Sequence, residues 1–418
     1  MSRSPVWHPF TQHATEPAMP EAVRTEGAYI ETRDGRRILD AISSWWVITH
    51  GHRHPRIVEA IRQATESLDQ VIFAGFTHEP AEQLATALVE LTPPGLNHVF
   101  YSDSGSTSVE VALKMALGAR RQRRDGRNRI VVMQHSYHGD TIGAMSVGER
   151  GVFNAAYEPL LFGVDTIPFP GAGRAQDTLD AFERFAKAGR AAALIVEPLI
   201  LGAGGMLVYP PAVLTELKRI AEATGTLFIA DEVMTGWGRT GTLFACEQAA
   251  ISPDVLCTSK GLTGGAIPLA ATLASDEIFD AHYSTDRTRT FFHSSSYTAN
   301  PIACAAGVAN VAVWRTEPVA ERIAALARIQ AGWMTRLSDH ERLQGARACG
   351  TIAAVNVRSE TGGYLAAVGP AIRAAFARRD ILVRPLGDAV YVMAPYCVTE
   401  SEIDRLYEAL IEIVTNEI

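Results

Sequence analysis

The segments LFIADEV (227–233) and DVLCTSKG (254–261) each contain a short apolar run that ends in charged or small polar residues. Continuous apolar runs of this length are typical of strands that are buried on both faces of a parallel sheet. An amphipathic helical pattern lies between two such runs, at 211–224. Similar apolar runs lie at 98–101, 130–134 and 193–197. Strands that alternate with helices predict an α/β fold, in which helices cover a mostly parallel sheet.

Both ends of the chain follow a different pattern. Residues 28–32 and 37–40 flank an Asp34-Gly35 pair, which is a strong hairpin signal. Toward the C-terminus, helical patterns at 317–337, 370–379 and 400–415 accompany strand patterns at 353–358 and 390–394. We therefore predict an N-terminal arm and hairpin (1–54), a large domain (55–310), and a C-terminal part (311–418) that joins the arm in a smaller α+β domain.

The composition is that of a globular enzyme. The chain has 418 residues, of which 47% are hydrophobic and 20% are charged, and its formal net charge is −8. The negative charge argues against nucleic acid as a partner, because phosphate binding needs a basic surface. One basic run, Arg120 to Arg124, is predicted to be the solvated end of a helix that begins near Ser108.

Cysteine usage and hydropathy indicate where the chain works. The five cysteines are dispersed and form no C-x-x-C pair, which indicates reduced thiols and a cytoplasmic location. The N-terminal residues lack the apolar core of a signal peptide. The most apolar stretch, 191–208, is interrupted by Glu197 and Pro198, so we expect no membrane-spanning segment.

The chemistry is expected at the carboxyl ends of two strands. Asp231 ends the first quoted run and Lys260 follows the second, and ligands of parallel sheets collect at this edge. A lysine can form a Schiff base with the aldehyde of pyridoxal phosphate (PLP), and a carboxylate can keep the ring nitrogen of PLP protonated. The alternative is a plain ion pair at a sheet edge, but the glycine-rich flanks, 231–241 and 261–265, have no purely structural explanation.

The residues that follow two further strands could bind the phosphate and the pyridine ring of PLP. Ser102 to Ser106 links a strand to a helix, and backbone N–H groups and hydroxyls at a helix N-terminus suit a phosphate, although such turns are often only helix caps. Tyr137 follows the run at 130–134 and could stack on the pyridine ring or simply fill the rim.

Other reaction classes are disfavoured. Gly202 to Gly205 lacks the G-x-G-x-x-G spacing of a dinucleotide site, which argues against a dehydrogenase. His50, His52 and His54 alternate as metal ligands could, but no carboxylate cluster accompanies them, so we predict no metal.

The chain resembles the class III (fold-type I) PLP aminotransferases over essentially its whole length. The matching motifs are WHPFT (7–11), SSWW (43–46), DSGS (103–106), YHGDT (137–141), DEVMTGWGRTG (231–241), SKGLTGG (259–265) and NPIACA (300–305). The tryptophan pair and the Trp-His-Pro start narrow the resemblance to the branch that acts in biotin biosynthesis. This branch implies transamination of 8-amino-7-oxononanoate to 7,8-diaminononanoate, with S-adenosylmethionine as the expected amino donor.

The resemblance implies a role for each residue at the cofactor. Lys260 would carry PLP and move protons, and Asp231 would contact the pyridine nitrogen. Gly105 and Ser106 would hold the phosphate. Tyr137 would stack on the cofactor and face the substrate, which makes it the third catalytic residue with Lys260 and Asp231.

The resemblance also implies the substrate-binding residues. Trp45 and Trp46 would form an apolar wall for the long carbon chain, and Arg384 would receive its carboxylate. Phe10 would face the substrate from the N-terminal arm.

A third set of residues implies a homodimer with the active site at the subunit interface. Ser295 and Ser296 match the segment that contacts the cofactor phosphate of the neighbouring subunit, and Ser294 would reach the substrate there.

Three positions depart from the family pattern. Phe10 stands where tyrosine is common, Leu201 replaces a glutamine, and Ser294 to Ser296 replace a Gly-Pro-Thr run. The first two leave the donor open between S-adenosylmethionine, lysine and another amine. The alternatives to the biotin branch are a class III aminotransferase acting on an ω-amino acid or amine, or an aminomutase on the same fold.

Overall fold

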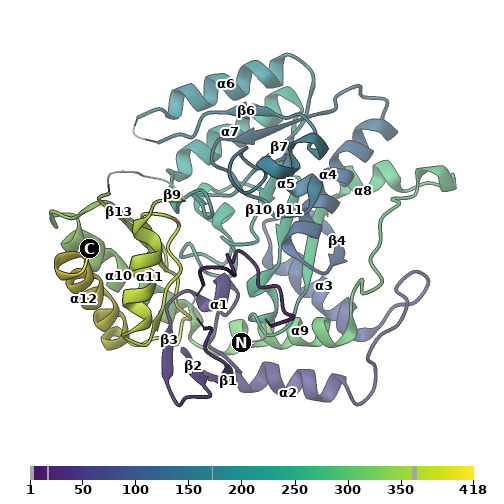
Figure 1. Ribbon diagram of the computed structural model, residues 1–418. Coiled ribbons are helices and arrows are strands. Elements are labelled where there is room, and N and C mark those ends of the chain that lie inside the picture. Colours follow the sequence, from purple (N-terminus) through teal and green to yellow (C-terminus); the bar gives the residue numbers. More distant parts are fainter. Residues whose placement is uncertain (1–3, 17, 172, 360–364) are drawn as a thin grey trace.

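The computed structural model describes residues 4–16, 18–171, 173–359 and 365–418. A seven-stranded sheet lies at its centre (Figure 1). In spatial order its strands are β4 (Leu96–Ser102), β12 (Ala270–Ser275), β11 (Val255–Thr258), β10 (Leu227–Asp231), β7 (Ala191–Val196), β5 (Arg129–Met133) and β6 (Asp165–Ile167). In this sheet β12 runs antiparallel to both of its neighbours and the other strands are parallel to one another. The predicted α/β class is confirmed, and the two quoted segments are the neighbouring strands β10 and β11.

Helices cover both faces of this sheet, as its continuous apolar strands predict. Along the chain the helices of this part are α2 (Pro55–Ala64), α3 (Glu79–Leu91), α4 (Gly105–Gln122), α5 (Ile142–Ser146), α6 (Ala175–Lys187), α7 (Pro211–Thr224), α8 (Asp276–His282) and α9 (Pro301–Thr316), of which α2 packs on α9 rather than on the sheet. Ile130 and Ile229 pack with residues of α4 and α8, whereas the alternate residues Val131 and Phe228 pack with α6 and α7. Successive side chains of a strand point to opposite faces, so each apolar run is covered by helices on both faces of the sheet.

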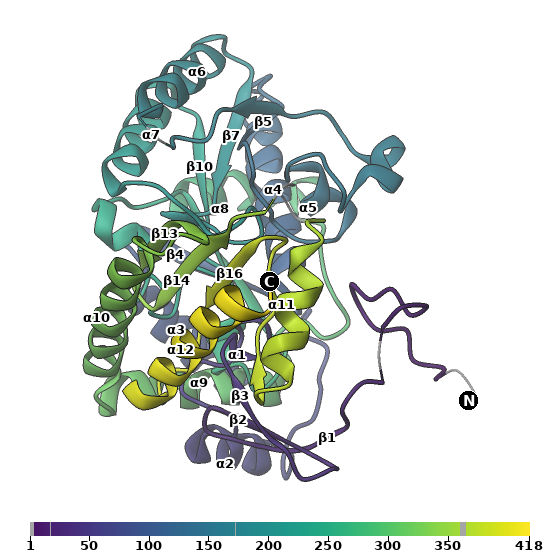
Figure 2. The same ribbon diagram turned by 60° about the vertical axis from the view of Figure 1, so that its left-hand side comes forward.

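The two ends of the chain meet in a separate sheet. The strands β2 (Tyr29–Thr32) and β3 (Arg37–Asp40) form the predicted hairpin, β1 (Ala22–Glu26) adds antiparallel to β2, and β15 (Ile381–Leu382) adds in parallel to β3. Three more strands, β13 (Leu343–Cys349), β14 (Ile352–Val357) and β16 (Ala389–Val392), form a sheet beside α10 (Val319–Leu337), α11 (Val368–Ala377) and α12 (Glu400–Asn416). Much of the arm before β1 projects from the rest of the molecule (Figure 2).

The division into domains stays a prediction. Residues 310 and 311, where we place the second boundary, lie inside α9, so the chain leaves the large sheet along one continuous helix. Ala28 and Leu39 share a buried cluster with residues of α10, α11 and α12, which supports a unit built from both chain ends.

Several local elements of the structure differ from the sequence prediction. The helix predicted from near Ser108 begins at Gly105, because the Ser104 hydroxyl accepts from the Thr107 N–H (3.2 Å) and the Thr107 hydroxyl accepts from the Ser104 N–H (3.0 Å) in a capping box. β12 was not predicted, because its alanine-rich sequence lacks a strand signature. The short edge strand β6 escaped prediction as well.

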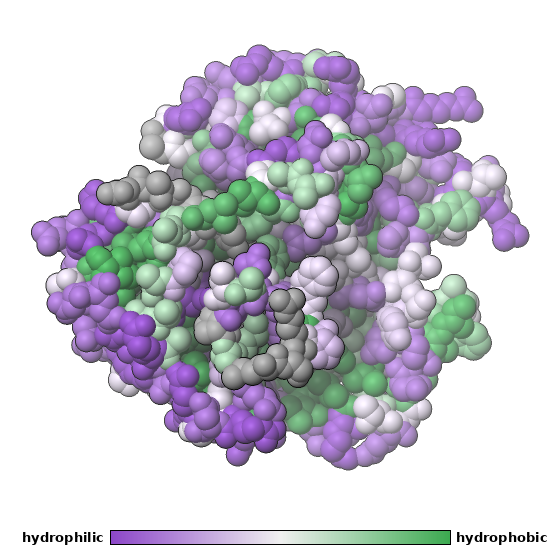
Figure 3. All heavy atoms as spheres, in the orientation of Figure 1, coloured by the Kyte–Doolittle hydropathy of each residue, from purple (hydrophilic) through white to green (hydrophobic). Residues whose placement is uncertain are grey.

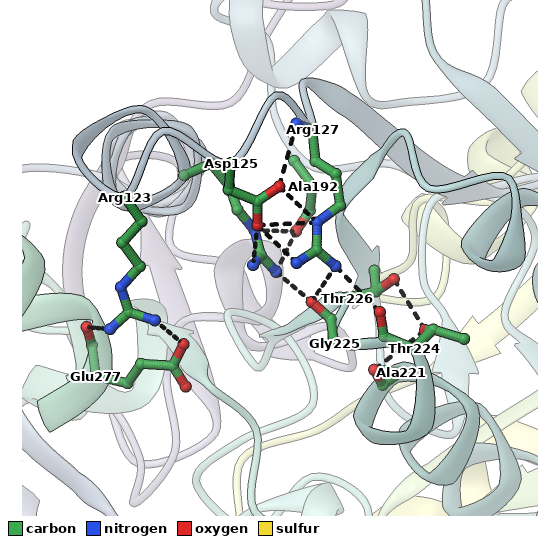
Figure 4. Close-up of polar contacts among 10 residues, drawn as sticks. Arg123, Asp125, Arg127, Ala192, Ala221, Thr224, Gly225, Thr226 and Glu277 are labelled. Carbon is green, nitrogen blue, oxygen red and sulfur yellow. Dashed lines mark hydrogen bonds and ion pairs between the residues drawn. The ribbon is translucent and has the colours of Figure 1, made fainter.

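The basic run at the end of α4 is not simply solvated. Arg120 is 5% exposed and forms an ion pair with Asp125 (2.8 Å), while its guanidinium also donates to the Ala192 carbonyl and the Gly225 carbonyl. Arg127 donates to the same carboxylate and the same Gly225 carbonyl (Figure 4). Arg120 therefore joins α4 to the end of α7, which corrects the prediction for this residue, whereas Arg121, Arg123 and Arg124 are exposed as predicted.

We expect Arg120→Ala to lower the free energy of unfolding by about 1–3 kcal/mol, because it leaves the Ala192 carbonyl without this donor and removes one of the two arginines that bind the Asp125 carboxylate and the Gly225 carbonyl. Arg121→Ala is the matched control, since Arg121 is exposed in the same helical turn and should change stability by about 0.5 kcal/mol or less. Urea denaturation of both variants checks the difference. Equal stability of the two variants would contradict a structural role for Arg120.

No helix among the described residues has the length and apolar composition needed to cross a membrane.

Candidate active site

Four strand ends converge on one small cavity. Asp231 is the last residue of β10, Lys260 lies two residues after β11, and the segments after β4 and β5 supply Gly105 and Tyr137. The cavity has a volume of about 150 Å³ and is lined by Trp46, Gly105, Ser106, Tyr137, His138, Gly139, Glu197, Asp231, Val233, Met234 and Lys260. The structure therefore brings together six of the residues predicted from the sequence. The remaining predicted residues lie outside this cavity.

Lys260 has a strained backbone, and its amine is buried although the residue as a whole is partly exposed. Its backbone has φ +41°, a left-handed conformation that non-glycine residues seldom adopt and that persists only where the surroundings enforce it. Its Nζ lies 4.8 Å from the centre of the Trp46 ring and, within the described part of the chain, makes no hydrogen bond or ion pair. Burial lowers the pKa of Lys260 to about 8, although the negative Asp231 and Glu197 oppose the shift. An amine with this pKa is partly neutral, and therefore nucleophilic, near physiological pH.

Asp231 is fixed by two partners. His138 Nδ1 lies 2.6 Å from one carboxylate oxygen, and the Val233 N–H donates to the other at 3.1 Å. His138 is buried, and its Nε2 has no partner among the described residues. His138 belongs to the motif YHGDT (137–141), but we predicted no role for it. Its place next to Tyr137 was the sequence feature that indicated a position in the site.

Glu197 is a second buried carboxylate that we did not predict as a site residue. It accepts from the backbone N–H groups of Tyr137 (3.0 Å) and Gly202 (2.9 Å), so it fixes the loops that follow β5 and β7. Burial raises the pKa of Glu197 to about 7, and the nearby His138 opposes that shift. Burial likewise raises the pKa of the Tyr137 hydroxyl well above its usual range.

The start of α4 forms a cradle that has no room for larger residues. A Cβ on Gly105 would lie 2.6 Å from Val233, and a Cβ on Gly139 would lie 2.1 Å from the Ser106 hydroxyl oxygen. The Ser106 hydroxyl in turn accepts from the Asp140 N–H at 3.2 Å. Backbone that approaches this closely at a helix N-terminus is suited to an anion such as phosphate.

The tryptophan pair lies on an unusual turn. The residues of α1 (Ser43–Trp46) all have positive φ, between 52° and 152°. The Ser44 hydroxyl donates to Asp40 (3.1 Å), which also contacts His52 Nε2 (2.9 Å). The buried Arg239 guanidinium donates to the Ile48 carbonyl (2.8 Å) just beyond the turn. These contacts from outside the turn explain how four strained residues are held.

The turn sends its two tryptophans in different directions. Trp46 lines the cavity, whereas Trp45 lies outside it and is 36% exposed. The Phe10 ring packs edge-on against Trp45 (5.6 Å), and the Arg384 guanidinium lies 4.7 Å from the Trp45 ring centre. Arg384 also donates to the Phe10 carbonyl (3.2 Å), so the arm lies over its own subunit's tryptophan here.

The serine segment lies away from the cavity of its own chain. Ser295 donates to the Asp103 carboxylate, and the Ser296 carbonyl accepts from Gln70 Nε2 at 2.8 Å. Ser294 and Ser296 are exposed.

The three histidines near residue 50 serve separate structural contacts. His50 lies 2.9 Å from the Asn310 amide oxygen, His52 contacts Asp40, and His54 contacts Glu317 at 3.1 Å.

Known proteins resemble this chain along nearly its full length. The sequence family described as aminotransferase class-III matches residues 10–414. The chain belongs to the class III aminotransferases. An adenosylmethionine-8-amino-7-oxononanoate aminotransferase of Synechococcus elongatus is 45% identical to it over 417 residues, which are 98% of each protein.

Solved structures agree with this class III aminotransferase assignment. An enzyme of the same description from Methanocaldococcus jannaschii has a TM-score of 0.94 and 32% identity, with 98% of this chain and 96% of that chain covered. An amine transaminase from an uncultivated Pseudomonas species, in its PLP-bound form, has a TM-score of 0.90 and 28% identity, with 98% of both chains covered. The chain is therefore a transaminase of a PLP-dependent family.

We expect the buried amine to destabilise this class III aminotransferase when no cofactor is bound. Because the folded-state pKa of Lys260 is about 8 and the ordinary value is 10.5, the unfolded chain holds the proton more tightly between these values. The penalty is therefore complete below pH 8 and disappears as the pH rises to 10.5. At pH 7 the cofactor-free Lys260→Met variant should exceed the wild type in free energy of unfolding by roughly 3 kcal/mol or less.

Urea midpoints of the two cofactor-free proteins between pH 6.5 and 10.5 would measure this difference. A variant that is no more stable than the wild type at pH 7 would show that the lysine is solvated rather than buried.

Proposed function

We propose that the chain carries PLP on Lys260 and transfers an amino group from adenosylmethionine to 8-amino-7-oxononanoate, forming 7,8-diaminononanoate for biotin biosynthesis. The observation that carries the proposal is the buried Lys260 beside the carboxylate of Asp231, which His138 fixes at 2.6 Å. The substrates come from the names of relatives such as the Synechococcus elongatus enzyme.

The residues present fit PLP. The aldehyde needs a free amine, and Lys260 Nζ has no hydrogen-bond or ion-pair partner within the described chain. The ring nitrogen needs a fixed negative charge, which Asp231 provides. The phosphate needs backbone N–H groups at close range, and Gly105 and Ser106, the first residues of α4, line the same cavity as Asp231 and Lys260.

Lys260, Asp231 and Tyr137 then have separate roles in the proposed reaction. Bound PLP supplies an electron sink that stabilises negative charge on the carbon next to the substrate nitrogen. Lys260 would hold PLP, and its amine would serve as the base that moves a proton at that carbon. Asp231 keeps the far end of the ring protonated. Tyr137, whose buried hydroxyl stays neutral, packs beside the ring and orients the substrate.

The surface around Trp45 suits the acceptor. A nine-carbon keto acid has an apolar chain and one terminal carboxylate, and Phe10, Trp45 and Arg384 combine two aromatic faces with a guanidinium. The guanidinium can bind the carboxylate through two parallel hydrogen bonds. The donor and the acceptor use one cofactor in turn, so ping-pong kinetics follow.

Spectroscopy of the cofactor-loaded protein tests this function. We expect adenosylmethionine alone to remove the absorbance at about 420 nm that is general for a PLP Schiff base, and 8-amino-7-oxononanoate to restore it. Lys260→Ala should lack the band and lower kcat by a factor on the order of a thousand or more. If adenosylmethionine and lysine leave the band unchanged while a simple ω-amine removes it, the chain is an ω-amine transaminase instead.

A homodimer in the cytoplasm is the expected state. Several aromatic residues are highly exposed on the arm and on two adjoining loops: Trp7 (88%), Phe76 (62%), Phe292 (71%) and Tyr297 (63%). Apolar side chains also gather in patches on the face drawn in Figure 3. Exposed aromatics on contiguous loops are typical of a subunit interface. The Ser294–Ser296 segment lies on one of these loops, as it should if Ser296 reaches the neighbour's phosphate.

Mixed dimers test the shared site. Lys260→Ala and Ser296→Ala should each be poorly active, but one of the two sites in a mixed dimer keeps both native residues. Random mixing makes half of the dimers mixed, so about a quarter of the wild-type activity should return. Activity assays after mixing and refolding measure this recovery. If Ser296→Ala binds PLP and turns over like the wild type, Ser296 has no role at the phosphate.

A further inference from the structure

A second cavity adjoins the first and is larger. Its volume is about 430 Å³, and it shares Tyr137, His138 and Gly139 with the cavity around Lys260. Its far wall is formed by Arg347, Asn356 and the turn that contains Asp388, which belong to the three-stranded sheet and the connection leading into it. A molecule that reacts at Lys260 can therefore extend past Tyr137 into this space.

Asp388 is a buried residue of that wall, and its carboxylate faces the cavity. It is 8% exposed, and among the described residues its carboxylate has no hydrogen bond or ion pair. A tight turn holds it, in which the N–H and carbonyl groups of Leu386 and Ala389 bond to each other (2.9 and 3.1 Å) around Gly387 at φ +65°. A buried charge without a partner is costly, so such a group is expected to meet a partner in the liganded protein.

Arg347 does not fill that role. Its guanidinium attracts Asp388 electrostatically. Its N–H groups are committed to the Met206 carbonyl (2.7 Å), the Gly345 carbonyl (2.6 Å) and Asn356 Oδ1 (2.7 Å). The guanidinium therefore offsets part of the burial cost of Asp388 while leaving the carboxylate open to the cavity.

The other carboxylates of the cavity differ from Asp388. Glu149 is 39% exposed and already contacts His135 Nδ1 at 2.9 Å. Asp140 is exposed to solvent. Asp388 is thus the buried acid of the cavity wall that remains available to a ligand among the described residues.

We propose that Asp388 binds the cationic sulfonium of the amino donor in the second cavity. The inference rests on the proposed function and extends it to the donor, which Phe10 and Leu201 leave undecided. In adenosylmethionine the sulfonium lies three bonds from the carbon that carries the reacting amine, and it bears the nucleoside. The cavity of about 150 Å³ that PLP would share has no space for a nucleoside, whereas the second cavity does.

The acceptor does not explain Asp388. In 8-amino-7-oxononanoate the ammonium neighbours the reacting carbonyl, so it must remain close to Lys260. Its remaining chain is apolar and ends in a carboxylate, which a buried aspartate would repel. The charge of Asp388 is therefore matched to the donor.

A pair of ligands that differ in one charge tests the proposal. Adenosylmethionine has a sulfonium, and adenosylhomocysteine has the same amino acid and nucleoside with a neutral thioether. We would measure the dissociation constant of each with the PLP-loaded enzyme, from the saturation of the spectral change or by competition. The wild type should favour the sulfonium, and Asp388→Asn should weaken adenosylmethionine about tenfold while changing adenosylhomocysteine by about twofold or less.

Glu149→Gln is the matched control, since it removes a carboxylate of the same cavity that already has a partner. It should keep the wild-type preference for the sulfonium. Asparagine is well tolerated in tight turns, so Asp388→Asn should retain the PLP absorbance. If it does not, Asp388→Ser is used for the same ratio.

The outcomes separate this inference from the proposed function. Equal weakening of both ligands, an unchanged ratio, or an increased KM for the keto acid alone would overturn the role of Asp388 while transamination stands. Failure of every donor to convert the bound PLP in the wild type would overturn the proposed function itself.

Discussion

The amine of Lys260 is buried and forms no hydrogen bond within the described part of the chain, and it sets the requirements that the surrounding structure must meet. Removing an ammonium group from water is costly unless opposite charge lies near or the amine loses its proton. The sheet order meets both conditions, because β10 and β11 are neighbours and their carboxyl ends place Asp231 and Lys260 at one edge. A mobile carboxylate would not stay close enough to Lys260 to offset the charge of its ammonium group. The contact with His138, which fixes Asp231, therefore serves the same purpose.

The turn at Ser43–Trp46 extends this constraint into the smaller part of the molecule. Trp46 lies with its ring centre 4.8 Å from Lys260 Nζ, at the end of a turn in which four consecutive residues have positive φ. Asp40 and Arg239 hold that turn from outside, and Arg239 comes from the loop that follows Asp231. One loop therefore supplies both the carboxylate of the site and the clamp on the wall of the site. These two roles explain why most residues from Asp231 to Gly241 are buried although they lie in a loop.

The sequence predicts the strands and site residues that depend on patterns among neighbouring residues. Continuous apolar runs predict β5, β7, β10 and β11, and the polar residues at their ends place Asp231, Lys260 and Tyr137 at one edge of the sheet. The sequence could not predict β12, whose alanines carry little preference, or the burial of Arg120, which depends on carbonyls 72 and 105 residues further along the chain. The positive φ values of the tryptophan turn and the unpaired state of Asp388 are likewise consequences of distant contacts. The position of Glu197 within a long apolar stretch was a signal that we used only against a membrane span.

A transaminase must admit two unlike substrates to one reactive amine, so the groups around that amine must suit both. The Arg384 guanidinium lies against Trp45, whereas the Asp388 carboxylate lies in the wall of the second cavity; the Phe153 ring links the two regions, because it lines that cavity and packs against Phe10 at 5.9 Å. Tyr137 borders both cavities, so under the proposed function it would contact either substrate. Burial raises the pKa of its hydroxyl, which keeps the side chain neutral through the pH range in which Lys260 exchanges its proton. Under the proposed function, a neutral donor at this junction would orient either substrate without favouring the charge of one over the other, and discrimination between the substrates would fall to the charged groups of Arg384 and Asp388.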